Sequence, residues 1–294
     1  MKTELEQFIE EEALKVKNTG VPVKASLIER LLVRKLSCKR MHPNPEDEFT
    51  FPDIGPNMTI ISSYVAQFKE NINKGLPLMD EPIFVQKIRP SGYMVLNGHH
   101  RWAAAMRLGI RQVPVSVVNA VFDGDIRVML EKVTHQKRAT LDLDEVVFAQ
   151  DDEEYTEKRR SPFRFGLQKK RLRLGIPALF KKLKVRGYDI WVYSSEYYSI
   201  DDIKRYLRHY SADVDGIITG MKKQTSKNDG MRKKVEEMIL NRYSTTLHID
   251  RDLLLMTQNR PGDFREIAIE GGPAGWSGAV IDALDGIEKD EKEK

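Results

Sequence analysis

Residues 95–109 read VLNGHHRWAAAMRLG, a stretch that changes from the pattern of a strand to the pattern of a helix. The apolar segment YMVLN at 93–97 is typical of a buried strand, and WAAAMRLG at 102–109 is typical of a helix that ends at Gly109. Upstream, PIFVQKI at 82–88 has a second strand pattern, and the intervening RPSG is a turn signal. We therefore expect a hairpin that is followed directly by a helix.

The junction between this strand and this helix carries a glycine and three side chains that can donate hydrogen bonds: Gly98, His99, His100 and Arg101. At a helix N-terminus, backbone N–H groups and the helix dipole attract an anion. Gly98 permits close approach of the chain to a ligand, and Arg101 can grip a phosphate with two hydrogen bonds. The pattern predicts a phosphate or nucleotide pocket, with a capped structural junction as the alternative.

Three segments of this half form a set: KLSCKRMHPNPEDEF at 35–49, EPIFVQK at 81–87 and LNGHHRWAAAMRLGIRQVPVSVV at 96–118. Together they resemble the ParB N-terminal/sulfiredoxin superfamily over residues 35–118. The resemblance implies an α+β domain that binds nucleotide phosphates at the glycine-histidine-arginine box, with ATP or CTP as the ligand.

Members of this superfamily differ in the residues of that box. Sulfiredoxins need a cysteine there, whereas the single cysteine of this chain, Cys38, lies elsewhere. Partition proteins usually have an acid–arginine pair and a following helix-turn-helix domain, and neither pattern is present, which disfavours sequence-specific DNA binding. The GHHR form is closer to the free serine kinases, in which a carboxylate must take the hydroxyl proton. Glu48, or its neighbours Glu46 and Asp47, is the candidate, with a solvated loop acid as the alternative.

A different pattern begins near residue 138. Apolar segments that end in polar or small residues are ATLDLDEVVF at 139–148, IWVYSS at 190–195, DGIITG at 215–220 and TTLHID at 245–250. Helical patterns separate these segments. Strands that alternate with helices predict a parallel α/β sheet.

Polar side chains lie at the predicted ends of several of these strands. Asp142 and Asp144 follow the first strand, and Asp250 ends the last. Ligand sites in open α/β sheets lie beyond the carboxyl ends of strands, and a Mg²⁺ ion relieves the repulsion between carboxylates there. Ser194, at the end of another strand, is placed to donate to a phosphoryl oxygen, and Lys227 to offset its charge. The set predicts phosphoryl transfer.

This ordered set resembles the haloacid dehalogenase superfamily of phosphatases over residues 138–284. The matching segments are DLDEVVF at 142–148, VYSS at 192–195 (through Ser194) and HIDRD at 248–252. The resemblance implies a Rossmann-like, three-layer α/β fold with a parallel sheet and little or no cap.

The same resemblance implies a role for each acid. Asp142 is the nucleophile and Asp144 the acid and base. Lys227 is the phosphoryl-binding lysine, with Lys222 or Lys223 as alternatives. The implied ligands of Mg²⁺ are Asp142, the backbone carbonyl of Asp144, and Asp250.

Composition limits what can be expected of the fold, the metal sites and the location of the protein. Hydrophobic residues make up 40% of the 294 residues, which suffices for folded cores. One cysteine excludes an internal disulfide and a multi-cysteine zinc site. No apolar run approaches the roughly 20 residues of a membrane span, so we expect a cytoplasmic protein with no membrane partner. The predicted parts are a helical extension at 1–34, the ParB/sulfiredoxin-like domain at 35–118, a helical linker at 119–137, the haloacid dehalogenase-like domain at 138–284 and a charged tail at 285–294.

The net charge is only +4, which by itself predicts no nucleic-acid binding. Locally the balance differs, because residues 158–186 contain twelve basic residues and no acid. This run predicts an anion-attracting rim for a phosphorylated polymer or a nucleic acid. The alternative is a solvated helix face that the acids at 151–157 neutralise.

The leading functional hypothesis is a Mg²⁺-dependent phosphohydrolase or phosphotransferase that acts through an aspartyl-phosphate on a phosphorylated substrate. The N-terminal half adds nucleotide binding or a kinase-like step. The alternative is a ParB-like regulatory or nucleic-acid-binding protein whose phosphatase domain is degenerate and does not turn over substrate.

Overall fold

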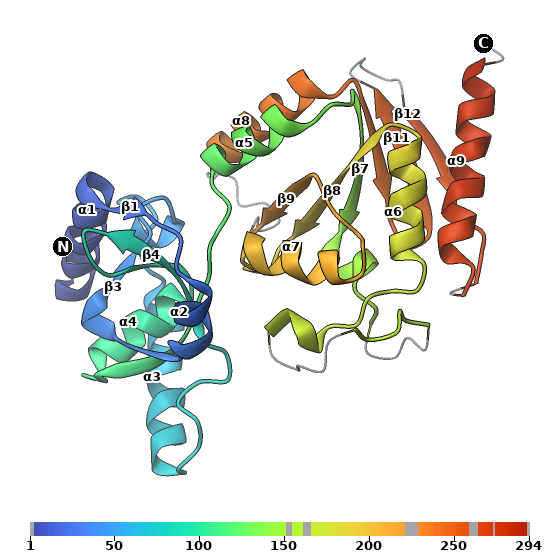
Figure 1. Cartoon of the computed structure of the whole chain (residues 1–294). Coiled ribbons are helices and arrows are strands. Elements are labelled where there is room, and N and C mark those ends of the chain that lie inside the picture. Colours follow the sequence, from blue (N-terminus) through green and yellow to red (C-terminus); the bar gives the residue numbers. More distant parts are fainter. Residues whose placement is uncertain are drawn as a thin grey trace. The chain divides into compact units, whose positions relative to one another are not determined.

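The computed structural model describes residues 3–150, 155–160, 166–220, 229–258, 264–272 and 274–292. The described residues divide into two compact units, residues 3–120 (unit 1) and residues 121–292 (unit 2). Figure 1 shows a separate sheet with its own helices in each unit.

Unit 1 contains a six-stranded mixed sheet in the order β2-β6-β4-β5-β3, with β1 paired to β4. The hairpin expected around RPSG is confirmed, because β4 and β5 pair antiparallel. The elements are α1 (Glu4–Thr19), β1 (Val21–Pro22), α2 (Leu27–Leu32), β2 (Lys35–Ser37), β3 (Met41–Pro43), α3 (Met58–Asn73), β4 (Ile83–Arg89), β5 (Tyr93–Asn97), α4 (His99–Arg107) and β6 (Gln112–Val117), with 3₁₀ turns at Cys38–Arg40 and Glu48–Thr50.

Helix α1, within the segment predicted as an extension, packs into the core of unit 1. Thr3 and Glu6 form a capping box at its start, which satisfies backbone N–H groups that the first turn leaves unpaired. Ile9 is buried in the same cluster as Trp102 of α4. The indole of Trp102 donates to the Cys38 carbonyl oxygen at 3.1 Å. The helix is therefore part of the folded unit.

Unit 2 contains a second six-stranded sheet in the order β12-β11-β10-β7-β8-β9. Its elements are α5 (Asp123–Lys132), β7 (Lys137–Asp142), α6 (Ile176–Val185), β8 (Tyr188–Ser194), α7 (Ile200–His209), β9 (Gly216–Thr219), α8 (Asp229–Arg242), β10 (Thr245–Ile249), β11 (Leu253–Gln258), β12 (Phe264–Ala268) and α9 (Trp276–Lys292), with a π-helical turn at Leu143–Val147 and a 3₁₀ turn at Gly166–Lys169.

This sheet is mixed, whereas the sequence analysis predicts a parallel one. Strands β10, β7, β8 and β9 are parallel, but β11 and β12 run antiparallel to their neighbours. The connection from β10 to β11 spans only residues 250–252. A parallel crossover needs about a dozen residues or more, so this short connection permits only an antiparallel return.

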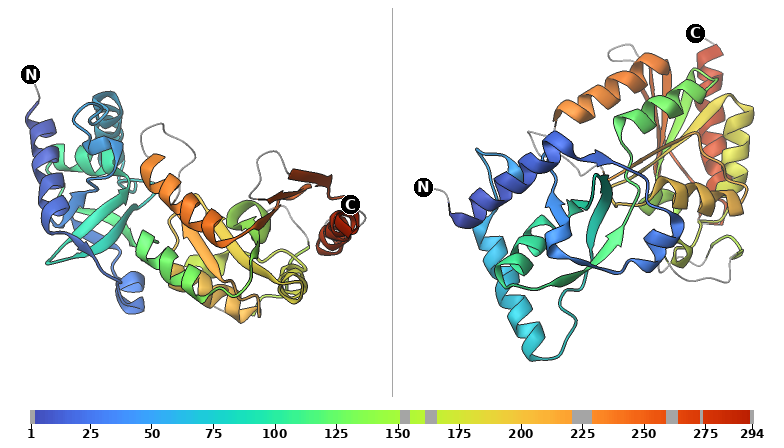
Figure 2. Two further views of the ribbon diagram at one scale, coloured as in Figure 1. Left: turned by 90° about the horizontal axis from the view of Figure 1, so that it is seen from above. Right: turned by 60° about the vertical axis from the view of Figure 1, so that its left-hand side comes forward.

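Helices cover both faces of the second sheet. Helices α6 and α9 lie on one face and α5 and α8 on the other (Figures 1 and 2). Lys234 of α8 forms an ion pair with Asp123 of α5, with 2.9 Å between Nζ and Oδ2. Because α5 packs against α8 and β9, most of the predicted linker at 119–137 belongs to unit 2.

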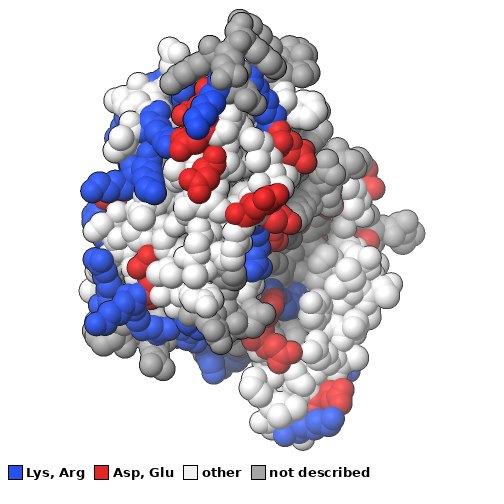
Figure 3. Space-filling view, turned by 90° about the vertical axis from the view of Figure 1, so that its right-hand side faces the viewer, with Lys and Arg blue, Asp and Glu red and all other residues white. Residues whose placement is uncertain are grey.

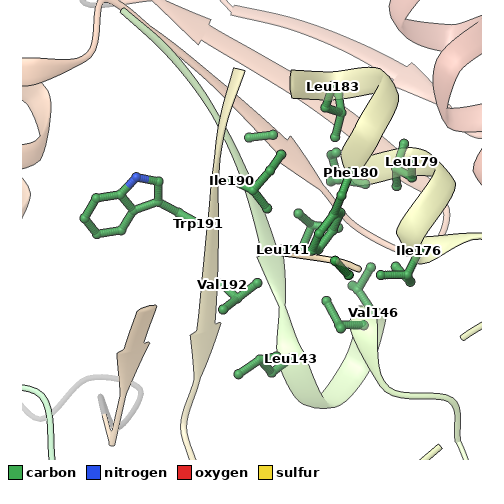
Figure 4. Packing of buried hydrophobic residues seen from close by; sticks show 14 of the residues in the cluster. Leu141, Leu143, Val146, Ile176, Leu179, Phe180, Leu183, Ile190, Trp191 and Val192 are labelled. Atoms are coloured by element: carbon green, nitrogen blue, oxygen red, sulfur yellow. The ribbon is translucent and has the colours of Figure 1, made fainter. Parts of the chain in front are cut away.

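The core of unit 2 forms where α6 packs on the sheet (Figure 4). Phe180 and Leu183 of α6 lie near Ile190 of β8, and Trp191 points to the opposite side of β8, as alternation along a strand requires. Trp191 is fully buried, and its Nε1 donates to the Tyr243 hydroxyl at 2.8 Å. A Cβ on Gly216 would lie 2.0 Å from the Trp191 ring, so the start of β9 accepts only glycine there.

Helix α9 continues to Lys292, through most of the segment predicted as a charged tail. Arg186, at the end of α6, forms ion pairs with Asp285 and Glu288 of α9, and Ile287 is buried. The hydrogen bond from Arg186 lowers the pKa of Asp285. Most of the predicted charged tail is therefore part of a packed helix. Within the part of the chain that the structure describes, no helix combines the length and apolar character needed to cross a membrane.

Candidate functional site

Three polar residues lie at the carboxyl ends of neighbouring parallel strands in unit 2. Asp142 ends β7 and pairs with Tyr193, which directly precedes Ser194 at the end of β8. Asp250 follows Ile249 of β10, which pairs with Leu141 of β7. Since neighbouring strands lie about 4.8 Å apart, this register brings Asp142, Ser194 and Asp250 to one edge of the sheet.

Asp142 is fixed through only one of its two carboxylate oxygens. Its Oδ1 accepts hydrogen bonds from the backbone N–H groups of Asp144, at 2.7 Å, and Glu145, at 2.9 Å. These bonds cap the turn at Leu143–Val147, whose Leu143 and Val146 are buried. Among the described residues, the other oxygen, Oδ2, accepts no hydrogen bond. The side chain is therefore oriented and keeps one oxygen available.

Asp144 is held by hydroxyl groups on both carboxylate oxygens. Ser194 Oγ donates to its Oδ2 at 2.6 Å, and the Tyr198 hydroxyl donates to its Oδ1 at 2.7 Å. Burial, and then the hydrogen bond to Asp144, raise the pKa of Tyr198. The Asp144 carbonyl oxygen accepts from Gln150 Nε2 at 2.8 Å. Sequence reasoning missed Tyr198 and Gln150, although both lie within six residues of a predicted site residue.

Asp250 is exposed and begins the turn from β10 to β11. Its backbone N–H donates to the Leu253 carbonyl oxygen, and its Oδ1 accepts from the Arg251 N–H at 2.7 Å. The indole of Trp276 donates to the Arg251 carbonyl oxygen at 2.7 Å, which ties this turn to α9. Asp250 Oδ2 has no hydrogen bond among the described residues. Asp142 and Asp250 thus each have one carboxylate oxygen that accepts no hydrogen bond among the described residues.

The donor atoms at this edge are carboxylate and carbonyl oxygens. The described residues contain no group of three or more His, Cys, Asp or Glu side chains arranged to hold one. The predicted set needs only two carboxylates and one carbonyl, all hard oxygen donors of the kind that Mg²⁺ prefers. Asp142 and Asp250 fit that set. The predicted lysine positions, Lys222, Lys223 and Lys227, lie outside the described residues.

A polar row leads along β7 toward Asp142. Arg138 Nε donates to Thr246 Oγ1 at 2.9 Å, and the next residue on the same face, Thr140, lies 2.9 Å from His248 Nδ1 through its Oγ1. His248 is exposed overall, yet desolvation of its ring, and then the positive charge of Arg138, lower its pKa to about 4. The imidazole is therefore neutral near pH 7. The alternation RATLD was the available sequence signal for this row.

One arginine of the basic run at 158–186 stabilises the turn that follows Asp142. This turn lies at the edge of the sheet that carries Asp142, Ser194 and Asp250, which we call the acid edge. Arg173 is buried, and it donates from Nε to the Val146 carbonyl oxygen at 2.7 Å and from Nη2 to the Glu145 carbonyl oxygen at 3.1 Å. Its guanidinium lies over the Trp276 ring, 5.1 Å from the centroid. Arg173 therefore stabilises the turn that follows Asp142 and takes no part in a solvated surface.

The predicted phosphate box of unit 1 lies at the start of α4. Gly98 precedes the helix with φ 96° and ψ 25°, a left-handed conformation that favours glycine. A Cβ there would lie 3.1 Å from Arg101 Nε and 3.3 Å from Ile83 Cγ1. Helix α4 begins directly after Gly98, so the first-turn N–H groups of the helix lie next to this glycine.

Each histidine of the box accepts a hydrogen bond at Nε2, so Nδ1 is the ring nitrogen left to act as the expected donor. His99 Nε2 accepts from the Asn44 N–H at 3.2 Å, and His100 Nε2 accepts from the Asn57 N–H at 3.2 Å. His99 is buried, and its Nδ1 lies 3.7 Å from Asp47 Oδ2. The rings therefore hold the segment between Asn44 and Asn57 against α4.

Arg101 and Glu48 have different surroundings. Arg101 is 7% exposed, and its Nη1 donates to the Glu81 carbonyl oxygen at 2.7 Å. Glu48 is half-buried, and no partner of its carboxylate is found among the described residues. Its neighbour Phe49 packs against both histidine rings, with centroid distances of 5.3 and 5.0 Å. Phe49 also lines a cavity of about 210 Å³ beside α1.

Comparison with known proteins gives a family for part of this chain. The ParB N-terminal domain family matches residues 57–134. This segment is therefore similar to a ParB N-terminal domain, and its last part, residues 121–134, lies in unit 2. The match begins at the residue that caps α3 and ends after α5, later than the 35–118 expected from the resemblance. The domain is of the α/β type.

Two solved structures are similar to the chain that carries this ParB N-terminal domain. One is the C-terminally truncated chromosome-partitioning protein ParB from Caulobacter crescentus, complexed with CTP-γ-S. It has 23% identity and a TM-score of 0.23, over 34% of this chain and 52% of that one, so this chain spans about half its length. The other is a mutant free serine kinase in complex with AMP, with 14% identity and a TM-score of 0.22, over 79% of this chain and 86% of that one. No curated protein matches the chain.

Proposed function

We propose that unit 2 is a Mg²⁺-dependent phosphohydrolase that acts through an aspartyl-phosphate at Asp142. The observation that carries this proposal is the convergence of Asp142, Ser194 and Asp250 at the carboxyl edge of three neighbouring parallel strands. Ligand sites of open α/β sheets lie at this edge. The haloacid dehalogenase resemblance of the sequence implies catalytic roles for Asp142 and Ser194 and a metal-binding role for Asp250.

The hydrogen bonds of Asp142 suit a nucleophile. Backbone N–H groups hold Oδ1, which fixes the direction of Oδ2 without engaging it. In the first half-reaction this oxygen forms a bond to phosphorus while the bond from phosphorus to the ester oxygen breaks. Asp144 gives a proton to that leaving oxygen, which requires one of its two hydroxyl donors to turn away, and the product is an aspartyl-phosphate with a free alcohol.

The surroundings of Asp144 suit the second half-reaction. The hydroxyls of Ser194 and Tyr198 donate to it, so they stabilise the carboxylate left after its proton departs. As a base, this carboxylate takes a proton from water while the water oxygen attacks the phosphoaspartate. Inorganic phosphate leaves, and Asp142 is restored as a carboxylate.

The residues at the edge of the sheet fit a divalent cation. Asp142, Asp250 and the Asp144 carbonyl would hold Mg²⁺, which when bound neutralises charge on the phosphoryl group. The side chains of Ser194 and Tyr198 keep Asp144 directed toward the same edge. A phosphate monoester is the substrate class that this arrangement fits.

Removal of Mg²⁺ tests this proposal directly. We expect the full-length protein to release inorganic phosphate from at least one class among nucleotides, sugar phosphates and phosphopeptides. Chelation with EDTA should lower the rate at least about a hundredfold, because the metal accounts for several kcal/mol of transition-state stabilisation. Added Mg²⁺ should restore the rate. An unchanged rate in EDTA would contradict the proposal.

A second candidate function is regulatory, with no turnover in unit 2. The observation that favours it is that Gln150 occupies the Asp144 carbonyl while hydroxyls occupy both Asp144 carboxylate oxygens. In this alternative the acid edge is a structural network. Under conditions with Mg²⁺, lack of phosphate release from every substrate class would favour it.

We also infer that the ParB N-terminal domain binds nucleotide phosphate at the start of α4. The left-handed Gly98 at the start of α4 supports this inference, because a helix N-terminus attracts an anion. Arg101 contributes by holding the Glu81 segment in place, while Glu48 is the carboxylate available for a kinase-like step.

Gly98→Ala is expected to weaken ATP or CTP binding by about tenfold or more, because a Cβ both strains the left-handed backbone and blocks close approach. Isothermal titration calorimetry on the full chain measures this effect. Gly109→Ala is the matched control, since Gly109 has φ +67° but no atom within 4 Å of the added Cβ. Equal nucleotide affinities in the two variants would count against the site.

A further inference from the structure

We propose that a groove on unit 2, away from the acid edge, binds a single strand of nucleic acid. The groove lies between α6 and the C-terminal end of α7, and its volume is about 650 Å³. Three cations, Arg160, Lys181 and Lys184, line it together with an apolar floor that includes Pro177 and Ala178. We call this surface the basic groove. It is independent of the proposed phosphohydrolase function.

The described cations of the basic run at 158–186 fall into two groups. Some are engaged within unit 2, and the others are exposed to solvent. Arg173 is buried, Arg186 pairs with α9, and Lys184 lies 3.3 Å from Asp215 through its Nζ. These three stabilise unit 2. The remaining described cations of the run are exposed: Lys158, Arg159, Arg160, Lys169, Lys170, Arg171, Lys181 and Lys182.

Neutralisation by neighbouring acids accounts for little of this charge among the described residues. Glu157, which the sequence offered as a counter-charge, accepts a hydrogen bond from the Gly175 N–H at 2.9 Å at the start of α6. Residues 151–154, the rest of that acidic segment, lie outside the described part of the chain. Lys158 and Lys181 have no carboxylate partner among the described residues. Among the described groups, no carboxylate competes with an external anion for these two lysines.

The face that Figure 3 draws shows how the charges are distributed. Lys and Arg side chains gather along the left side of this face, whereas Asp and Glu lie mainly in the middle. On the α7 side of the groove, Arg208 is paired with Asp213 at 3.6 Å. Of the cations that line the groove, Lys181 and Lys184 belong to α6, and Arg160 belongs to the segment before it.

One rim cation is already fixed in position. Arg160 donates from Nη1 to the His209 carbonyl oxygen at 3.1 Å, and its guanidinium lies 5.9 Å from the centroid of the Tyr210 ring. A fixed cation loses less conformational freedom when it contacts an anion. The groove therefore presents Arg160 as a prearranged contact and Lys181 as a mobile one.

The apolar floor favours a single strand over a duplex. Ala178 is exposed, and Val185, also at the groove, is 81% exposed. A single strand can place phosphates against the rim cations while its sugars and bases cover apolar surface. A duplex hides its base faces within the stack and would leave this floor uncovered. An acidic peptide would satisfy the cations, and the test below includes it.

Fluorescence anisotropy with a labelled 20-nucleotide deoxythymidine strand tests the assignment on the full chain. We expect binding that weakens as salt rises. Arg160→Glu with Lys181→Glu, two cations that line the groove, should weaken it about tenfold or more, and the slope of log affinity against log salt should fall by about 1.4 for two lost phosphate contacts. Lys132→Glu with Lys289→Glu changes net charge equally at exposed lysines elsewhere in unit 2 and should change affinity less than about twofold.

Several outcomes would overturn the proposal. They are the absence of binding by the wild type, equal losses in the two double variants, equal affinity for a duplex of the same length, and equally effective competition by polyglutamate. Unfolding temperatures of both double variants should match that of the wild type, because Arg160 and the three substituted lysines are exposed. Asp142→Asn should leave strand affinity unchanged, so failure here is distinguishable from failure of the phosphohydrolase proposal.

Discussion

Asp142→Asn is expected to lower the turnover of a phosphate monoester by roughly 10³-fold or more. The amide oxygen can still accept hydrogen bonds from the Asp144 and Glu145 N–H groups, so the turn after β7 is preserved. What is lost is the anionic oxygen that forms the bond to phosphorus. Steady-state phosphate release, measured at saturating Mg²⁺ on the best substrate found, checks this expectation.

A nearby aspartate provides the matched control for that variant. Asp252 is exposed and follows Asp250 by two residues, so Asp252→Asn makes the same charge change close to the same edge. We expect this control to retain the wild-type turnover. Retention of full turnover by Asp142→Asn, or an equal loss in both variants, would remove Asp142 as the nucleophile. Circular dichroism spectra that match the wild type would exclude unfolding as the cause.

Trp191→Ala is expected to lower the free energy of unfolding of unit 2 by about 3–5 kcal/mol, the usual cost of truncating a buried large aromatic residue. Trp191 is fully buried, and its ring fills the space above Gly216. Truncation leaves a cavity there and removes the donor to the Tyr243 hydroxyl. Urea denaturation followed by circular dichroism measures the loss, and hydrogen exchange of β8 amides assigns it to unit 2.

An exposed aromatic residue of the same unit is the control for this core prediction. Phe264 of β12 is 63% exposed, so Phe264→Ala removes a ring without opening a buried cavity. We expect its effect to stay within about 0.5 kcal/mol, as for most surface substitutions. Similar losses in both variants would contradict the view that Trp191 anchors the packing between β8 and β9.

The alternation and periodicity of the chain predict most of unit 2 correctly up to β10, but not its far edge. Strands β7, β8, β9 and β10 are each short apolar runs that end in polar or small residues. This pattern is contained within a few neighbouring residues, so the sequence predicts it directly. Strands β11 and β12 were missed. The turn signal NRPGD at 259–263 between LLLMTQ and FREIA was the available evidence for a hairpin there.

In unit 1 the sequence indicated the place of the candidate site but not the role of its side chains. A strand, a glycine and a helix start follow one another within 95–109, so their junction is a local property. Whether His99 donates or accepts depends on Asn44, which is 55 residues away. Likewise, Arg101 is engaged by Glu81 only because β4 lies beside α4.

Sequence alone determined which residues end the strands of unit 2, because a strand's periodicity and its polar end are encoded within a few neighbouring residues. Parallel pairing then brings Asp142, Ser194 and Asp250 to one edge. Only the tertiary structure decided that Ser194 and Tyr198 hold the two carboxylate oxygens of Asp144. Such contacts join residues far apart in the chain, and packing and chain direction, rather than local pattern, bring them within hydrogen-bond distance.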